Sequence, residues 1–421
     1  MNPTSYEIDA GGNYIGYREA FDLIHSYTRP KGTEEISMDS SMHRIAAEDV
    51  IAPIDYPSVD ISLKDGYAVK SADVAQASTQ RPISLTVIGS VFAGSNCKIP
   101  VRSGSAAKIC SGAPIPTDAD AVVAAEFCKE TSGKKVHIMA NAEKGRNILQ
   151  AGAEIKTGNV IVRQHGILHP GNMGLAAAAG IDRVHVYRLP TVAIIGVGDE
   201  IVAPGEELRP GQIYASNLIN LKAWLSSFHI ECRTSVVRDD GDAIKFEIRK
   251  RLPHVDAVLT SGGAWGSERD LVISTFRELG WREIFHHVRM GPGKGIAFGI
   301  FKNKPIFCLP GGPASNEMAF LQLALPGILL MSGNRHHPLQ TVPARLTEDL
   351  KSRHRNWTEF KDAILSGNSD GTYTVQIYGN RSRLQSIANA NSLVCIPEGT
   401  EILNRGDIVP VQSLRNRLGI P

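Results

Sequence analysis

Three glycine-rich stretches each follow directly on a short apolar run, at residues 196–200, 260–263 and 310–313. Glycine lets a backbone approach a ligand closely and adopt positive φ angles. Backbone N–H groups that converge at such turns bind anions. The first stretch also carries two acids, Asp199 and Glu200, which suit a divalent metal. Together the three stretches predict a phosphate-bearing ligand held with a divalent metal.

A plainer interpretation exists for each stretch taken alone. Short glycine motifs are common in ordinary strand-to-helix connections. For residues 260–263 taken alone, such an ordinary connection is favoured over an anion-binding site. The neighbouring stretches change this balance, because parallel strands all end at one edge of a sheet, where ligands bind in α/β proteins.

The elements that must position these stretches alternate between strand and helix from about residue 189 onward. Ser216 or Asn217 is expected to cap a helix that carries Leu218 and Leu221. A helix over residues 314–330 is expected to close the domain, and the composition of residues 332–338 predicts a linker.

The remaining sequence is richer in strand signals. Residues 70–135 show short alternating runs separated by glycine, which predict a small barrel or sandwich. Before them, a long polar loop ends in Asp65-Gly66. That loop is either a plain surface turn or a segment that holds an acid over a site. Residues 342–414 predict a small all-β domain.

Composition limits the classes of function. The 421 residues exceed the size of one core, so several domains are expected. The net charge of +2 argues against a nucleic-acid binder. The six cysteines show no zinc spacing. No apolar run is long enough for a bilayer, and no signal peptide is recognised, so the protein is expected in the cytoplasm, without a membrane partner.

A series of short motifs runs through the chain in a fixed order. They are residues 57–69 (PSVDISLKDGYAV), 109–114 (ICSGAP), 198–200 (GDE), 211–217 (GQIYASN), 239–240 (DD), 261–270 (SGGAWGSERD), 292–294 (PGK) and 309–313 (LPGGP). In order and spacing, from about residue 15 to 415, they resemble the molybdopterin molybdenumtransferases, the MoeA and gephyrin family.

The resemblance implies a multidomain fold of the α/β plus β class, in an elongated homodimer. Its parts would be an N-terminal MoeA-like region, a doubly wound α/β molybdopterin-binding domain and a C-terminal small β-barrel domain. The corresponding ranges are 15–187, with an inserted β-rich domain at about 65–140, then 188–332 and 340–416.

The resemblance also implies an activity. The family inserts molybdate into adenylylated molybdopterin with Mg²⁺ and releases AMP in molybdenum cofactor biosynthesis. A molybdopterin adenylyltransferase and apo-molybdoenzymes would be its protein partners. The sequence does not distinguish molybdate from tungstate.

Site residues are carried over from the matching motifs. The catalytic acids would be Asp65, Glu200, Asp240 and Asp270, and three of these, Asp65, Glu200 and Asp270, would also hold the metal. The residues expected to bind pterin and phosphate are Ser111, Ser261, Gly262, Gly263, Lys294, Pro310, Gly311, Pro313 and Ser315.

Several loop positions depart from the family pattern, namely Ile61, Lys64, Trp265, Ser267, Gly291, Gly312 and Arg381. Lys64 and Arg381 are expected to restore the positive charge that the family carries at Gly291. Trp265 would either stack on a pterin or adenine ring or fill the ligand's space. The departures leave open a second function, a pterin carrier or scaffold without turnover. An unrelated phosphotransferase ranks last because the chain lacks a GxxxxGK[ST] loop.

Overall fold

The structure is a computed structural model that describes residues 14–96, 99–131, 133–263, 271–379 and 382–414. The chain forms two compact units. One comprises Met1–Glu34 with Tyr187–Pro421, and the other is Glu35–Val186. Across the described ranges, no helix combines the length and apolar character needed to cross a membrane.

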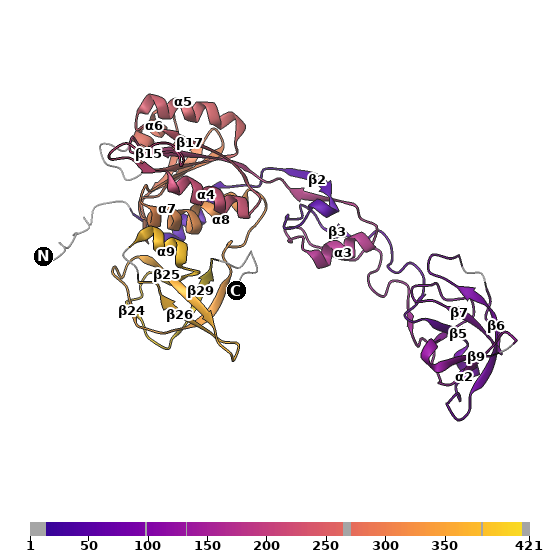
Figure 1. The fold of residues 1–421 in the computed structure, drawn as a ribbon. Coiled ribbons are helices and arrows are strands. Elements are labelled where there is room, and N and C mark those ends of the chain that lie inside the picture. The colour runs from indigo at the N-terminus through magenta and orange to yellow at the C-terminus, as the bar shows by residue number, and fades with distance from the viewer. Residues whose placement is uncertain (1–13, 97–98, 132, 264–270, 380–381, 415–421) are drawn as a thin grey trace. The chain divides into compact units, whose positions relative to one another are not determined.

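A six-stranded sheet forms the centre of the α/β domain, in the order β17-β14-β18-β22-β21-β19 (Figure 1). The first four strands are parallel, β21 runs antiparallel to β22, and the edge strand β19 runs antiparallel to β21. The strands are β14 (Thr191–Val197), β17 (Glu231–Val237), β18 (Ala257–Ser261), β19 (Arg282–His286), β21 (Ala297–Phe301) and β22 (Lys304–Leu309).

Helices cover both faces of this sheet, with α5 and α6 on one face and α4, α7 and α8 on the other (Figure 1). Successive residues of β14 alternate between the two cores, so that Ile194 packs on one side and Ile195 on the other. The predicted doubly wound α/β domain is therefore confirmed. Its helices are α1 (Tyr17–Tyr27), α4 (Ser216–Ser227), α5 (Gly241–Arg251), α6 (Leu271–Glu278), α7 (Pro313–Ala319) and α8 (Leu325–Leu330), with η4 (Phe320–Ala324) joining α7 to α8.

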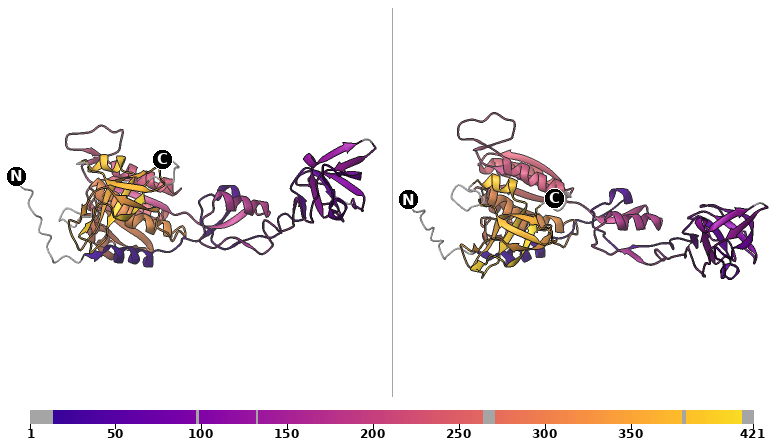
Figure 2. Two further views of the ribbon diagram at one scale, coloured as in Figure 1. Left: turned by 90° about the horizontal axis from the view of Figure 1, so that it is seen from below. Right: turned by 60° about the horizontal axis from the view of Figure 1, so that its bottom comes forward.

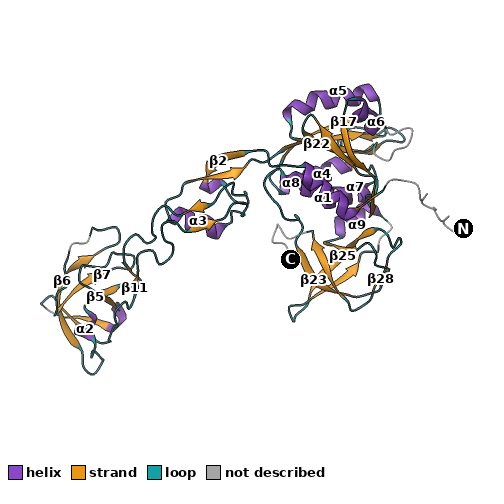
Figure 3. Cartoon of the chain, turned by 180° about the vertical axis from the view of Figure 1, so that it is seen from behind, coloured by secondary structure: helices purple, strands orange, loops and turns teal. Residues whose placement is uncertain are grey.

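The C-terminal strands close into a small barrel (Figure 3). Each strand pairs with the next in the ring β25-β26-β23-β29-β27, and β27 pairs back to β25, which leaves no open edge in the ring. The predicted C-terminal β-barrel is thus confirmed. Its elements are β23 (Thr341–Leu346), β24 (Leu350–Lys351), β25 (Thr358–Gly367), β26 (Tyr373–Ile377), α9 (Arg383–Asn389), β27 (Ser392–Ile396), β28 (Ile402–Leu403) and β29 (Ile408–Ser413).

Two short strands join this barrel to the α/β domain. β20 (Val288–Gly291) pairs with β25, and β1 (Ile15–Gly16) pairs with β20. In both views of Figure 2 the yellow C-terminal elements lie against the α/β domain, and α9 contacts α7. The barrel can therefore deliver side chains to the α/β domain.

The unit Glu35–Val186 contains a six-stranded sheet in the order β8-β5-β7-β6-β10-β9, the predicted inserted β-rich domain. The hydroxyl of Tyr67 on β5 donates to Glu130 on β9, although these strands are not paired neighbours. The sheet must therefore curl so that its ends approach. Its strands are β5 (Gly66–Val69), β6 (Ile83–Val91), β7 (Ser105–Ile109), β8 (Ala121–Ala124), β9 (Cys128–Thr131) and β10 (Lys135–Ile138).

Shorter elements complete the chain. Paired strands are β2 (Thr33–Ser37) with β13 (Arg183–Tyr187), β3 (Val50–Ile51) with β12 (Val160–Val162), β4 (Ile61–Ser62) with β11 (Ile148–Leu149), and β15 (Ile201–Val202) with β16 (Ile213–Tyr214). The helices among these elements are α2 (Ser71–Val74) and α3 (Pro170–Ala178).

Candidate functional site

The three glycine-rich loops meet where the strand order reverses. From β14 the chain passes to β17 on one side, then crosses to β18 on the other side of β14. Open α/β sheets bind ligands outside the strand ends at such a reversal, because the connections diverge there and leave a crevice. The loops after β14, β18 and β22 all lie at this carboxyl edge.

Gly262 brings the loops into direct contact. Its backbone N–H donates to the carbonyl of Leu309 at 3.1 Å. A Cβ atom on Gly262 would lie only 2.4 Å from the carbonyl oxygen of Val197, and its φ is +99°. A Cβ atom on Gly311 would lie 3.5 Å from the Cα atom of Gly262. Close approach and backbone conformation therefore both require glycine at position 262.

Ser261 links two asparagines that the sequence analysis did not assign to the site. Its hydroxyl oxygen accepts from the amide of Asn316 at 3.0 Å and from that of Asn217 at 3.1 Å. Asn316 also donates to Pro310 O, and Asn217 donates to Gly311 O, each at 2.8 Å. These four hydrogen bonds hold the loops after β18 and β22 in one arrangement.

The predicted helix cap, Ser216 or Asn217, is wrong for both residues. Helix α4 begins at Ser216 and its N-cap is Ala215, so Asn217 lies inside the helix and its amide extends to the neighbouring loops. The motif at residues 211–217 pointed to Asn217 as a residue of interest. The sequence of the motif alone did not show which loops the Asn217 side-chain amide would reach.

Helix α7 begins at this edge, directly after Gly312. Pro313 occupies its first position, and no side chain among the described residues caps the helix. The first N–H groups of a helix have no intrahelical partner, so those of the first turn, which includes Ser315, are available to an anion. Of the predicted phosphate-binding residues, six lie together here: Ser261, Gly262, Pro310, Gly311, Pro313 and Ser315, with Gly263 directly after Gly262.

The acidic residues predicted to take part in catalysis or metal binding lie on separate segments of the chain. Asp199 and Glu200 are exposed in the loop after β14, and the Glu200 carboxylate lies over Gly198, where a Cβ atom would meet its Oε2 at 2.5 Å. Asp240 caps α5 by accepting from the N–H of Ala243 at 2.8 Å, so it has a structural role. Asp270, like Trp265 and Ser267, lies outside the described residues. No three His, Cys, Asp or Glu side chains cluster as metal ligands within the described ranges.

Lys294 lies near the same edge. It precedes β21, whose first residue, Ala297, pairs with Cys308 near the end of β22. Its ammonium lies 5.7 Å from the ring centroid of Trp357 in the barrel domain, a cation–π arrangement. Burial lowers the pKa of Lys294.

Asp65 and Ser111 lie in the unit Glu35–Val186 and contact each other. The N–H of Ser111 donates to a carboxylate oxygen of Asp65 at 2.9 Å, and the Asp65 carbonyl accepts from Ala125 N at 2.8 Å. Asp65 thus holds the turn that contains Ser111, and its carboxylate remains exposed. Lys64 is exposed beside it, and Arg381 lies outside the described residues.

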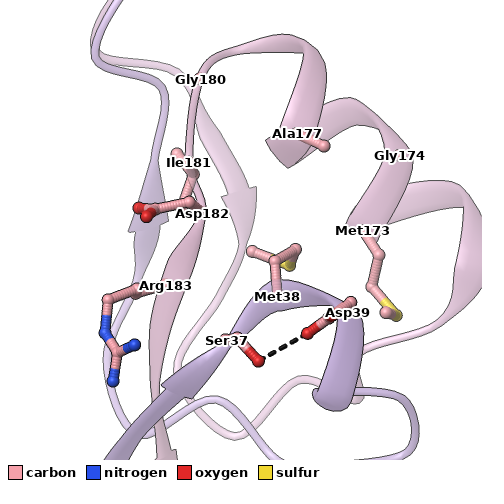
Figure 4. A pocket seen from close by; sticks show the side chains of 10 residues that line it. All are labelled: Ser37, Met38, Asp39, Met173, Gly174, Ala177, Gly180, Ile181, Asp182 and Arg183. Atoms are coloured by element: carbon pink, nitrogen blue, oxygen red, sulfur yellow. Dashed lines mark hydrogen bonds between the residues drawn. The ribbon is translucent and has the colours of Figure 1, made fainter.

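A cavity of about 780 Å³ lies in the same unit, between the end of β2, helix α3 and the start of β13 (Figure 4). Met38, Met173 and Ile181 make its wall largely apolar, and the hydroxyl of Ser37 donates to the carboxylate of Asp39, both of which line the cavity. None of the predicted site residues lines it.

Glu317, a buried acid, was not recognised from the sequence. It follows Asn316 on α7, and its Oε1 accepts from Trp224 at 3.0 Å and from Asn220 at 3.1 Å. Burial raises the pKa of Glu317, the carboxyl of Asp362 raises it further, and the two hydrogen bonds oppose this shift. The local sequence shows no periodic signal that separates a buried glutamate from a solvated one.

Comparisons with protein families cover most of the chain. Residues 15–180 match the MoeA N-terminal region (domain I and II), residues 193–329 match a probable molybdopterin binding domain, and residues 343–414 match the MoeA C-terminal region (domain IV).

Individual proteins with similar sequences or structures carry related names. A molybdopterin molybdenumtransferase of Haemophilus influenzae is 30% identical over 404 residues, covering 94% of this chain and 98% of its own. A putative molybdopterin biosynthesis protein of Methanocaldococcus jannaschii is 29% identical, covering 94% and 96%. The crystal structure of a molybdopterin biosynthesis moeA protein from Pyrococcus horikoshii OT3 superposes with a TM-score of 0.80 at 30% identity, over 95% of this chain and 100% of that one.

The contact of Gly262 with Val197 leads to a prediction. Gly262→Ala is expected to lower the free energy of unfolding by about 2–5 kcal/mol, because positive φ and overpacking both oppose the new methyl group. Gly205→Ala is a matched control, since Gly205 has φ +98° but no atom within 4 Å of its Cβ position, and it should lose only about 1–2 kcal/mol. Urea denaturation of both variants measures the difference, and equal losses would contradict a steric role.

Glu317 leads to a second prediction. A carboxyl with a raised pKa in the folded state contributes stability that is present below its ordinary pKa and lost as pH rises through the raised value. Glu317→Gln stays uncharged and can keep both hydrogen bonds, so relative to the wild type its unfolding free energy should increase between pH 4 and pH 8. Denaturation at both pH values tests this, with the exposed Glu207→Gln as control. A pH-independent difference would show that Glu317 is not the titrating group.

Proposed function

Because the chain belongs to the MoeA family of molybdopterin molybdenumtransferases, we propose that it is a transferase of molybdenum cofactor biosynthesis. It inserts molybdate into adenylylated molybdopterin and releases AMP. The observation that supports this best is the contact of three glycine-rich loops at the reversal of strand order, with Asn217 and Asn316 bonded to one serine hydroxyl. This arrangement suits a ligand with phosphate groups.

Phosphate recognition follows from the backbone of the site. Ser261 and Gly262 are held by hydrogen bonds within the protein, so binding of a ligand does not need to order these groups. Such preorganisation lowers the entropic cost of association. The first-turn N–H groups of α7 then supply donors toward the phosphate.

The donor set at this edge fits a hydrated Mg²⁺ ion. Mg²⁺ usually keeps several waters and takes one or two carboxylates together with substrate phosphates, and the exposed carboxylate of Glu200 beside the phosphate loops is a ligand of this kind. Mg²⁺ when bound neutralises the phosphate charge and polarises the anhydride. Glu200, Asp65 and Asp270 are the acids we propose to hold it, as the family pattern implies.

Activity can be measured directly. Purified chain with adenylylated molybdopterin, Mg²⁺ and molybdate is expected to release AMP, detected by chromatography. Glu200→Gln should reduce the rate about 100-fold or more, because a neutral amide is a much weaker ligand for Mg²⁺. Glu207→Gln, a nearby exposed change, should leave the rate unchanged. Tungstate in place of molybdate tests the choice of oxyanion.

One outcome would contradict the proposed activity, and another would contradict the role of Glu200. Absence of AMP release together with tight pterin binding would identify a carrier or scaffold. Unchanged release in Glu200→Gln would remove Glu200 from the reacting site while leaving the activity itself established.

We also propose a homodimer, as the family pattern implies. Light scattering at micromolar concentration is expected to give twice the 45.5 kDa mass of one chain. The measurement should be repeated at 1 M salt, where surface ion pairs are screened. A mass of one chain at both salt concentrations would contradict the dimer.

A further inference from the structure

The described parts of the three loops carry no lysine or arginine. These parts are residues 198–200, 261–263 and 310–316, where Asp199 and Glu200 add negative charge. A phosphate monoester carries about −1.5 to −2 charges at pH 7. The ammonium of Lys294 lies over the Trp357 ring. A further positive group beside the loops would strengthen the binding of such an anion.

Arg383 is in the right place to supply it. This residue is the first of α9, in the C-terminal barrel domain, and α9 contacts α7. A Cβ atom on Gly312 would lie 3.6 Å from Nη1 of Arg383. Gly312 directly precedes α7, so the guanidinium lies beside the loop after β22 and close to the first turn of α7.

The glycine at position 312 fits this arrangement. Gly312 has φ −69° and ψ 129°, a conformation open to any residue, so the backbone does not require glycine. The atom that a Cβ would meet within 4 Å is the Arg383 nitrogen. The missing side chain therefore leaves the guanidinium free access to the loop.

Arg383 is an exposed residue, and no hydrogen bond or ion pair links its guanidinium to another described residue. Arg383 is also a basic residue in the first turn of α9. The partial positive charge at a helix N-terminus favours acidic residues there. Residues that break a local rule commonly mark functional positions. Arginine, with a planar fork of donors, matches the oxygens of a phosphate.

We infer that Arg383 binds the phosphate of the pterin substrate from the barrel domain, and thereby supplies the charge that the sequence analysis assigned to Arg381. This inference rests on the proposed function. The guanidinium and the first-turn N–H groups of α7 would contact the same phosphate from two sides.

Calorimetric titration of the full chain with molybdopterin tests this inference. Arg383→Ala is expected to weaken binding about 10- to 100-fold, the effect of losing a hydrogen bond to a charged group. Arg383→Lys should recover part of the loss, since a lysine keeps the charge but not the fork. The affinity of the wild type should also fall more steeply with salt than that of Arg383→Ala.

Arg249→Ala provides a matched control. It removes the same charge from an exposed position in the last turn of α5. Helix α5 starts after the carboxyl end of β17 and finishes before β18 begins, so Arg249 lies toward the opposite edge of the sheet. Its affinity for molybdopterin should equal that of the wild type.

The same pterin with its phosphate removed separates phosphate contact from general packing. Wild type and Arg383→Ala should bind this ligand equally. If Arg383→Ala binds molybdopterin as tightly as the wild type, the inference is wrong and the proposed function stands. An equal loss with both ligands would also overturn it, because Arg383 would then support the loop rather than bind phosphate. Failure of the wild type to bind molybdopterin would overturn the proposed function and the inference together.

Discussion

Burial of both faces of the parallel sheet is the constraint on which the site depends. Helices cover β14, β18 and β22 on either side, and all five residues of β18 are buried. A sheet packed in this way can present polar chemistry only at its edges. The three strands therefore stop in glycine-rich loops at one edge, where small residues let the backbones approach one another.

Polar hydrogen bonds then define the geometry of that edge. Ser261 accepts from two asparagines that also bond the loop after β22, and Asn316 is almost fully buried. An unsatisfied amide in such a position would cost more than a surface one, so the network has one favoured arrangement. The loops are thus ordered by the protein itself, which is the condition for binding a phosphate without a large entropic loss.

The C-terminal barrel contributes to the site through its packing on the α/β domain. The strand β20 joins the barrel sheet through β25, and α9 contacts α7. This brings Trp357 to Lys294 and Arg383 to Gly312. Residues separated by more than sixty positions in sequence become neighbours, and the charge of the site depends on them.

The sequence by itself determined the layered α/β domain, the β-rich insertion, the C-terminal barrel and the three loops, because strand periodicity, glycine and motif order are local properties. Tertiary structure alone decided which side chains serve those loops. Asn217 looked like a helix cap but bonds two neighbouring loops, the capping of α5 by Asp240 was not foreseen, and Glu317 and Arg383 gave no local signal. The physical reason is that hydrogen bonding, burial and charge pairing depend on neighbours from distant segments, which only the packed chain brings together.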